Sequence, residues 1–396
     1  MQFADFRNRQ FLVQHIKDTL DFYLPRAIDP SGGLYHYFKD DGTLYNRRTR
    51  HLVSSTRYVI TLSQAYCRFG DRHLKDALEH AFKFLLDQHR EPSNGGWRWM
   101  LDWDGSSART LDSAQHAYGH AFAVLACAHA CKAGLDDAKT ALYAAFSLME
   151  QRFWQTQWGL YADEADANWR LTDYRGQNAN MHACEAMLAA YEATQDTRFL
   201  HRAELLAKNV VQRQTVLTKD LVWEHFKPNW EPDWDYNLGD NQNLIRPWGF
   251  QPGHLTEWAK LILILNSYRP QAWALERAQA LYAAAFLYAW DEENGGLHYG
   301  FSPNGQVCLP QKYHWVQCET LAAAARLAAV TGNSAYWRDY DKLWRYCWQH
   351  FVDHQHGAWF RILDTDNSKI TDEKSPASKV DYHNMGACHD ILDSTQ

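Results

Sequence analysis

The sequence lacks the features that would place the protein in a membrane, outside the cell or on nucleic acid. No apolar run reaches the ~18 residues of a membrane-spanning helix, and the first residues lack the basic-then-apolar pattern of a secretion signal. The net charge of −7 is spread without long runs of one sign, which gives no electrostatic case for nucleic acid or anionic membranes. The eight cysteines show no CxxC spacing, so we expect reduced thiols in a cytoplasmic protein.

Metal-site signatures are equally scarce. The HExxH pattern is absent, and the nearest approach to a ligand pair is His116 and His120, four residues apart on one predicted helix. We therefore predict no metal ion and no other cofactor. A catalytic metal stays the minority alternative, because several His and Glu side chains are expected near one rim of the fold.

Aromatic side chains and histidines, in contrast, are abundant. The 396 residues include 18 Trp, 21 Tyr and 20 His, and 46% of the chain is hydrophobic. A chain of this length can bury a large core, as one big domain or two ordinary ones. Excess aromatic side chains often belong to the core, but sugar-binding clefts also use them, because aromatic rings match the apolar faces of pyranoses.

Six short aromatic segments, most of them containing glycine, recur along the chain. Their anchor residues are Gly33, Gly96, Gly159, Val222, Gly296 and Gly357. The steps between successive anchors are 63, 63, 63, 74 and 61 residues. Acidic or glycine turn residues follow several anchors, as in strand–turn–strand units. This regularity predicts a repeat architecture rather than a chance similarity of turns.

Segments of helical periodicity separate the aromatic segments and total twelve. The predicted ranges are 9–24, 51–69, 73–90, 113–133, 135–151, 177–194, 197–214, 252–267, 271–290, 313–331, 334–351 and 382–392. No Pro/Gly-rich linker marks a domain break. We therefore predict one all-α domain over residues 1–396, an (α/α)6 barrel of twelve helices with short β-hairpins at the active-site rim. An open α-solenoid is the alternative; closure is favoured because the last helix would otherwise lack a partner.

The first helix of each pair is rich in small residues and is predicted to lie in the inner ring, with all inner helices beginning at one rim. Chemically active side chains gather at these starts: His51, Arg57, Gln115, His116, Tyr118, His120, Asn178, Asn180, His182, Glu185, His254, Glu257, His314, Trp315, Gln317, Glu319, Asp381, Tyr382 and His383. Each alone has a plainer role in capping, ion pairing or core packing. Helix starts ordinarily carry small caps and acids, so the whole set predicts a shared polar pocket.

The helix start at residues 249–258 carries the sharpest single signal. Pro252 suits a first helical turn, where its missing N–H costs nothing. His254 and Glu257 are three residues apart and project from one face of that turn. An imidazole with a carboxylate beside it is a proton-transfer device, so we predict that Glu257 orients His254.

Four stretches resemble the N-acylglucosamine 2-epimerase superfamily, in particular its aldose–ketose isomerase branch: residues 50–57, 178–186, 252–258 and 381–383. The resemblance covers about the whole chain. It implies an (α/α)6 barrel, no metal and two acid–base histidines, which match His254 and His383. The family's sugar-contacting positions match Arg57, Tyr118, Asn178, His182, Glu257 and Trp315.

The activity implied by this resemblance is the interconversion of mannose and fructose, with lyxose and xylulose as further substrates. We expect His383 to move a proton from C2 to C1 through a cis-enediolate, because an imidazole titrates near neutral pH. His254 would serve ring opening, and Arg57 would stabilise the enediolate oxygen. Gln317 and Glu319, at the same rim, are added as substrate-binding residues.

Other functions stay open at this point. A sugar 2-epimerase shares the same intermediate, so the sequence separates it poorly from an isomerase. A glycoside hydrolase needs two carboxylates, which Glu257 with Asp233, Asp235 or Glu319 could supply. A non-catalytic sugar-binding or interaction protein is the third alternative. The expected partner is a monosaccharide, and the expected state is a monomer or small homo-oligomer.

The loop before the Pro-Gly-His sequence bears on the substrate's charge. It belongs to the longest step between anchors, which holds several Trp and Tyr residues and is predicted to form a lid over the site. The related sulfosugar isomerase carries an additional Arg in this loop. Leu244 stands there in this sequence, with Arg246 nearby. The resemblance therefore argues against a sulfonated substrate.

Overall fold

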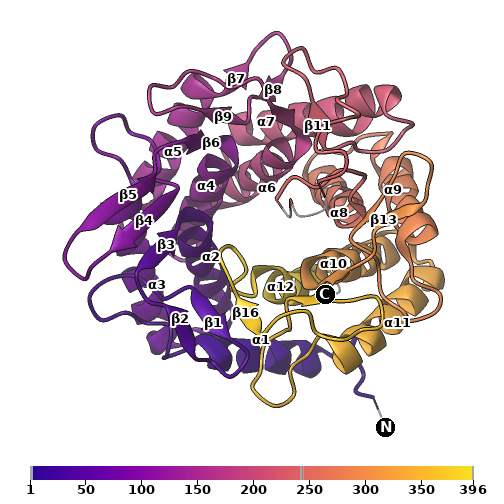
Figure 1. Ribbon diagram of the computed structural model, residues 1–396, viewed down its shortest axis with the longest axis horizontal. Coiled ribbons are helices and arrows are strands. Elements are labelled where there is room, and N and C mark those ends of the chain that lie inside the picture. Colours follow the sequence, from indigo (N-terminus) through magenta and orange to yellow (C-terminus); the bar gives the residue numbers. More distant parts are fainter. Residues whose placement is uncertain (1–2, 241–242, 244, 395–396) are drawn as a thin grey trace.

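The chain folds into two concentric rings of helices (Figure 1). The computed structural model describes residues 3–240, 243 and 245–394. The inner ring consists of α2 (Leu52–Phe69), α4 (Ala117–Lys132), α6 (Gln177–Thr194), α8 (Pro252–Tyr268), α10 (His314–Thr331) and α12 (Tyr382–Ser394). The outer ring consists of α1 (Arg9–Tyr23), α3 (Arg72–Phe84), α5 (Ala138–Arg152), α7 (Thr197–Lys208), α9 (Ala274–Ala289) and α11 (Ser334–His350). The described part of the chain thus confirms the predicted (α/α)6 barrel of twelve helices.

The barrel is closed rather than open. The last helix, α12, packs against α10 on one side and against α1 and α2 on the other, so the two ends of the chain meet. The open solenoid is therefore wrong. No helix in the described residues is both long enough and apolar enough to cross a lipid bilayer.

Side-chain size and polarity sort the helices between the rings. The inner helices α4 and α10 carry runs of fully buried alanine, such as Ala121, Ala123 and Ala322 to Ala325, which let neighbouring helices approach closely. The outer helix α3 is amphipathic and buries Leu74, Leu78 and Phe82 on one face. The inner ring therefore faces helices on both sides, while the outer ring meets solvent on one.

Several helix ends differ from the predicted ranges. The segment predicted to begin a helix at residue 113 instead forms a short strand at Gln115–His116, and the helix begins at Ala117. The predicted helices over 73–90 and 197–214 end in wider π-helical turns at Leu85–His89 and Asn209–Gln214. Periodicity could not register these changes, because a strand of two residues leaves almost no pattern.

Short strands form the rim at which the inner helices begin. They are β1 (Tyr37–Lys39), β2 (Leu44–Asn46), β3 (Thr49–His51), β4 (Met100–Trp103), β5 (Ala108–Asp112), β6 (Gln115–His116), β7 (Trp154–Gln155), β8 (Leu160–Tyr161), β9 (Glu164–Ala165), β10 (Arg175–Gly176), β11 (His225–Phe226), β12 (Gly300–Phe301), β13 (Val307–Leu309), β14 (Lys312–Tyr313), β15 (Ile362–Leu363) and β16 (Glu373–Ser375). Some pair as predicted within one repeat, such as β4 with β5. Others join consecutive repeats: β3 with β4, β6 with β9, β10 with β11 and β14 with β15.

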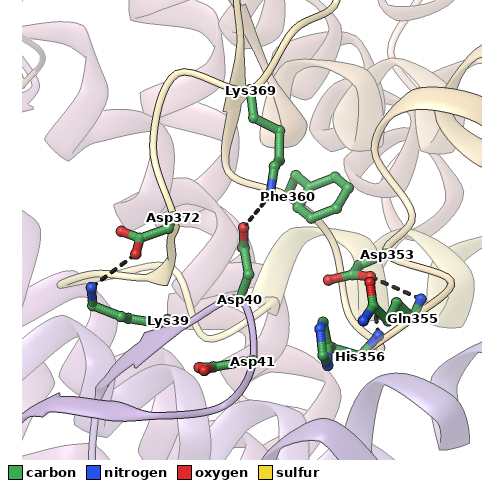
Figure 2. Close-up of a pocket in the computed structure, with 9 residues that line it drawn as sticks. All are labelled: Lys39, Asp40, Asp41, Asp353, Gln355, His356, Phe360, Lys369 and Asp372. Carbon is green, nitrogen blue, oxygen red and sulfur yellow. Dashed lines mark hydrogen bonds and ion pairs between the residues drawn. The ribbon is translucent and has the colours of Figure 1, made fainter.

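The same pairing closes the ring between the last repeat and the first. Strand β16 pairs with β1, where Phe38 lies opposite Ser375. Beside this seam Lys39 bonds Asp372 at 2.8 Å and Lys369 bonds Asp40 at 2.7 Å, around a surface hollow of about 270 Å³ (Figure 2). These cations and carboxylates satisfy one another, so the hollow is a cross-linked seam between repeats.

Candidate active site

A cavity of about 710 Å³ opens at the rim where the inner helices begin. Every inner helix contributes lining side chains: Arg57 from α2, Tyr118 from α4, Asn178 and His182 from α6, His254 and Glu257 from α8, Trp315 from α10 and His383 from α12. The structure therefore brings together eight of the ten side chains assigned from the sequence. Six helix N-termini also point toward this region, which favours developing negative charge.

His254 is held by Glu224, a residue that the sequence interpretation did not select. Its Nδ1 lies 2.9 Å from Oε1 of Glu224, and the other Glu224 oxygen accepts a hydrogen bond of 2.9 Å from the Gln177 amide. Because Nδ1 donates to the carboxylate, Nε2 is left as the free acceptor. The prediction that Glu257 orients His254 is wrong, because the imidazole of His254 bonds Glu224, which directly precedes β11.

His383 has the same kind of partner from another helix. Its Nδ1 lies 2.6 Å from Oε1 of Glu319, and the other oxygen of Glu319 accepts from Lys260 at 2.7 Å. Burial, with further contributions from Arg57 and His182, holds the pKa of His383 well below its ordinary value. Glu319 does not line the cavity, so its predicted contact with substrate is corrected to the orientation of His383.

The indole of Trp315 lies between the two imidazoles. Its ring centroid is 5.0 Å from that of His254 and 5.9 Å from that of His383, so both rings meet one cavity across a single side chain. Gly253 makes this arrangement possible, because a Cβ at that position would lie 2.3 Å from the indole. The glycine before His254 therefore keeps an apolar platform between the two titratable rings.

Arg57 supplies a fixed positive charge in the cavity. Its guanidinium carbon lies 4.8 Å from the ring centroid of Phe122 and 4.6 Å from that of Tyr382. The guanidinium donates to the backbone carbonyl of Ser378 and, at 3.3 Å, to the hydroxyl of Tyr118. These contacts hold an always-protonated group where it can meet an oxyanion.

Glu257 and His182 also line the cavity, with Nδ1 of His182 3.9 Å from Oε1 of Glu257. Glu257 is only 1% exposed, and neither carboxylate oxygen has a hydrogen-bond partner. Burial, reinforced by the nearby Glu319 carboxylate, raises the pKa of Glu257 well above its usual range. His182 is oriented by Glu185 at 2.9 Å, and burial lowers its pKa.

Several other buried polar atoms of the lining have no hydrogen-bond partner. They are Oδ1 of Asn178, both amide atoms of Gln251, Nε2 of His116 and Nε2 of His314. Buried donors and acceptors are ordinarily satisfied, by protein or by water or ligand. A cavity with this mixture of unsatisfied donors and acceptors, beside aromatic faces, fits a polyhydroxylated ligand.

Gln317 does not belong to this lining. Its amide oxygen accepts from the backbone N–H of Leu297 at 2.9 Å, and its amide nitrogen donates to the carbonyl of Leu297 at 2.8 Å. The predicted contact with substrate is therefore corrected: Gln317 clamps the preceding turn onto α10. Asn180 makes the same two hydrogen bonds with the backbone N–H and C=O of Tyr161, so this side chain also stabilises the turn of its repeat.

Two carboxylates proposed for a hydrolase are also absent from the lining. Asp233 and Asp235 do not line the cavity, and Glu319 is engaged by His383 and Lys260. Of that group only Glu257 meets the cavity. The carboxylate pairs that the hydrolase alternative needed are thus not assembled there.

The loop before α8 partly covers the cavity. Ile245, Arg246 and Pro247 line it, as does Tyr236 from the same segment. Arg246 makes an ion pair with Glu164 and lies 3.8 Å from the centroid of the Tyr174 ring. Leu244, the position at which the related sulfosugar isomerase carries an additional Arg, lies outside the described residues.

Within the described residues, two groups of side chains have donor atoms close enough to hold a cation: His182, Glu185 and Glu257, and Glu257, Glu319 and His383. In both groups the imidazole is already hydrogen-bonded to a carboxylate. Lys260 places a positive charge beside Glu319, which opposes a second cation. The donor set fits a hydrogen-bonded network, and metal-free chemistry stays a prediction.

Fold and site together define an (α/α)6 barrel in which two carboxylate-bound histidines line one cavity at the rim. The family model described as N-acylglucosamine 2-epimerase matches residues 33–387. The chain belongs to this family, which confirms the resemblance found in the sequence.

Within this family, the chain is similar to D-mannose isomerases over almost its whole length. A D-mannose isomerase of Marinomonas mediterranea is 46% identical over 394 residues, covering 99% of both chains. A crystal structure of a D-mannose isomerase superposes with a TM-score of 0.96 at 46% identity, covering 99% of this chain and 100% of that one. The cellobiose 2-epimerase of Spirochaeta thermophila superposes with a TM-score of 0.85 at 22% identity, covering 98% and 96%, which shows the shared fold alone.

Proposed function

We propose that the protein is an aldose–ketose isomerase that interconverts D-mannose and D-fructose, and that residues 1–396 act as one catalytic domain. The observation that carries the proposal is the pair of carboxylate-bound imidazoles, His254 and His383, on either side of Trp315 in one cavity. The similarity to D-mannose isomerases at 46% identity supports the same activity.

His383 is the base of the proposed reaction. Its Nδ1–H donates a hydrogen bond to Glu319, which leaves a lone pair on Nε2. This lone pair takes the proton from C2 of the open-chain aldose, and the resulting Nε2–H returns it to C1 of the cis-enediolate. Its lowered pKa keeps the imidazole neutral, as a base must be before the transfer. Arg57 stabilises the oxygen that gains negative charge.

His254 and Glu257 serve the oxygens of the sugar. His254, fixed by Glu224, opens the ring by exchanging a proton between the ring oxygen and the anomeric hydroxyl. Glu257, whose raised pKa keeps its carboxyl protonated, donates a hydrogen bond to a hydroxyl or carbonyl oxygen. Asn178, His182 and Tyr118 hold the remaining hydroxyls.

The substrate that fits this cavity is an uncharged monosaccharide. Arg246 lines the cavity and could bind an anionic group, but its charge is neutralised by an ion pair with Glu164. Burial raises the pKa of Glu164, but His116 and Arg246 outweigh this effect and lower the pKa to about 2, so Glu164 is ionised. An anionic sugar would therefore have to displace a formed ion pair. Lyxose is mannose without C6, and xylulose is fructose without C6. Both sugars therefore stay within the proposed substrate range.

The test is product analysis with chelator-treated protein. Incubation with D-mannose should yield fructose, and a His383→Ala variant should lose at least a thousandfold in turnover. Glucose without fructose would replace the proposal by the 2-epimerase alternative, which the two imidazoles facing one cavity also permit. Unchanged turnover in His383→Ala would show that the base is misassigned.

Cellular location and assembly complete the proposal. The cysteines are unpaired, in agreement with reduced thiols, and we propose a cytoplasmic protein. A monomer or small homo-oligomer is proposed, and sedimentation analysis would measure it.

A further inference from the structure

Lys260 is a buried lysine that the proposed chemistry leaves without a role. It lies on α8, one turn after Glu257, and its side chain is 8% exposed. Its ammonium lies 2.7 Å from Oε2 of Glu319 and 3.4 Å from Asp390. Burial lowers the pKa of Lys260, but Glu319 and Asp390 outweigh that effect and raise it well above the usual value.

Glu319 connects this cation to an imidazole at the cavity. One of its oxygens accepts from Lys260 and the other from Nδ1 of His383. The three groups come from α8, α10 and α12, so the line crosses three neighbouring inner helices. It ends at the side chain that faces the substrate.

Among the described residues, the hydrogen-bonded chain of the other histidine of the site contains no such cation. Glu224, the partner of His254, accepts from the neutral amide of Gln177, whose oxygen in turn accepts from Trp258 at 2.7 Å. The two dyads are thus alike in geometry and differ by one positive charge. A difference of this kind separates the roles of two chemically identical rings.

We propose that Lys260 is a positioning residue for His383, acting through Glu319: it fixes the carboxylate on Nδ1 and balances its charge, so that His383 presents a neutral Nε2 acceptor to the sugar. This inference rests on the proposed function, in which His383 is the base. Lys260 itself lies behind Glu319 and touches no substrate.

Electrostatics explain why the cation is needed. An unbalanced buried carboxylate beside an imidazole favours the imidazolium, which has no lone pair to accept a proton. The charged and titratable groups around His383 are Glu319 and His314 from α10, Arg57 from α2, His182 and Glu185 from α6, Glu257 and Lys260 from α8, Tyr382 from α12 and Lys379 from the preceding turn. Removal of Lys260 leaves this set with one positive charge fewer and draws a proton toward the ring.

The test compares Lys260→Met with Lys260→Arg across pH in the full-length protein. In Lys260→Met the acid limb of the kcat/KM profile should move upward by about one pH unit, so activity on that limb falls up to about tenfold below the wild type, while activity at pH 8 changes little. The change should appear in kcat, with KM within about twofold. Lys260→Arg, which keeps the charge, should restore the wild-type profile at least in part.

A matched control separates positioning from general stability. Lys374 is also buried in an ion pair, with Asp353, but it lies on β16, and its printed hydrogen bonds go to Asp353 and the backbone carbonyl of Gly357 rather than to the partner of a cavity histidine. Lys374→Met should therefore lower the melting temperature without moving the acid limb. Equal shifts of the limb in both lysine variants would overturn the inference.

Nitrogen-15 NMR of labelled histidine gives a readout that needs no activity. Near neutral pH, His383 should be neutral with its proton on Nδ1, and on acidification it should become an imidazolium at a pH about one unit higher in Lys260→Met than in the wild type. The same titration midpoint of His383 in both proteins would overturn the inference even if the enzyme makes fructose. Absence of any mannose conversion, with the NMR change present, would instead overturn the proposed function.

Discussion

The hydrogen bond between Glu224 and His254 allows a quantitative prediction. Glu224→Gln keeps the shape of the side chain but removes the negative charge that accepts from Nδ1 at 2.9 Å. A hydrogen bond to a charged group contributes roughly 1.5–3 kcal/mol. The amide can also donate to Nδ1, which would place the ring proton on Nε2 and block the atom that meets the sugar.

At 1.36 kcal/mol for each factor of ten in rate, the expected loss in kcat/KM is about 10- to 100-fold. Conversion of D-mannose to fructose is the assay, measured at several pH values because His254 gains or loses its proton during ring opening. A mutarotation catalyst, which speeds formation of the open-chain sugar without changing its equilibrium amount, should recover part of the loss. Glu231→Gln, an exposed acid-to-amide change in the same segment, is the control.

Turnover of Glu224→Gln within twofold of the wild type would refute this reasoning. Glu224 would then be a structural partner only, and some other group would fix the tautomer of His254. A large loss in Glu231→Gln would likewise show that the segment, rather than the carboxylate, is being measured.

Three further predictions follow from single contacts. Gly253→Ala forces a methyl group against the Trp315 indole, so we expect a loss of about 1–3 kcal/mol in the free energy of unfolding and at least tenfold in kcat/KM; normal values for both would contradict the close approach. Gln317→Ala leaves the buried N–H and C=O of Leu297 unpaired, so unfolding should become easier by about 1–3 kcal/mol while KM stays within twofold; a tenfold rise in KM at unchanged stability would return Gln317 to the substrate. Burial lowers the pKa of His15 and of His89 to about 4, so between about pH 6.5 and 4 the unfolded chain binds more protons than the folded protein, and the melting temperature should fall as the pH drops. His89→Gln should reduce the dependence of the melting temperature on pH. An unchanged dependence would exclude this histidine as a cause.

The sequence determined the repeat and the place where chemistry gathers. Steps of about 63 residues between aromatic turns, with two helical segments between them, are local patterns that survive in one dimension. Alanine-rich and charge-rich helices sort themselves into inner and outer rings, because small residues permit close packing and charges require water. From there the assembly of Arg57, Asn178, His254 and His383 at one rim follows from the order of the elements alone.

Only the tertiary structure decided which side chains touch. His254 and Glu257 are neighbours along the helix, yet His254 bonds Glu224, thirty residues earlier, because its ring turns toward the strand at the rim. Glu319 and Gln317 sit among site residues in sequence, yet one faces His383 and the other a backbone turn. Periodicity gives the face of a helix on which a residue lies, but a partner on another helix depends on how the rings close, and that register is written in no local stretch of the chain.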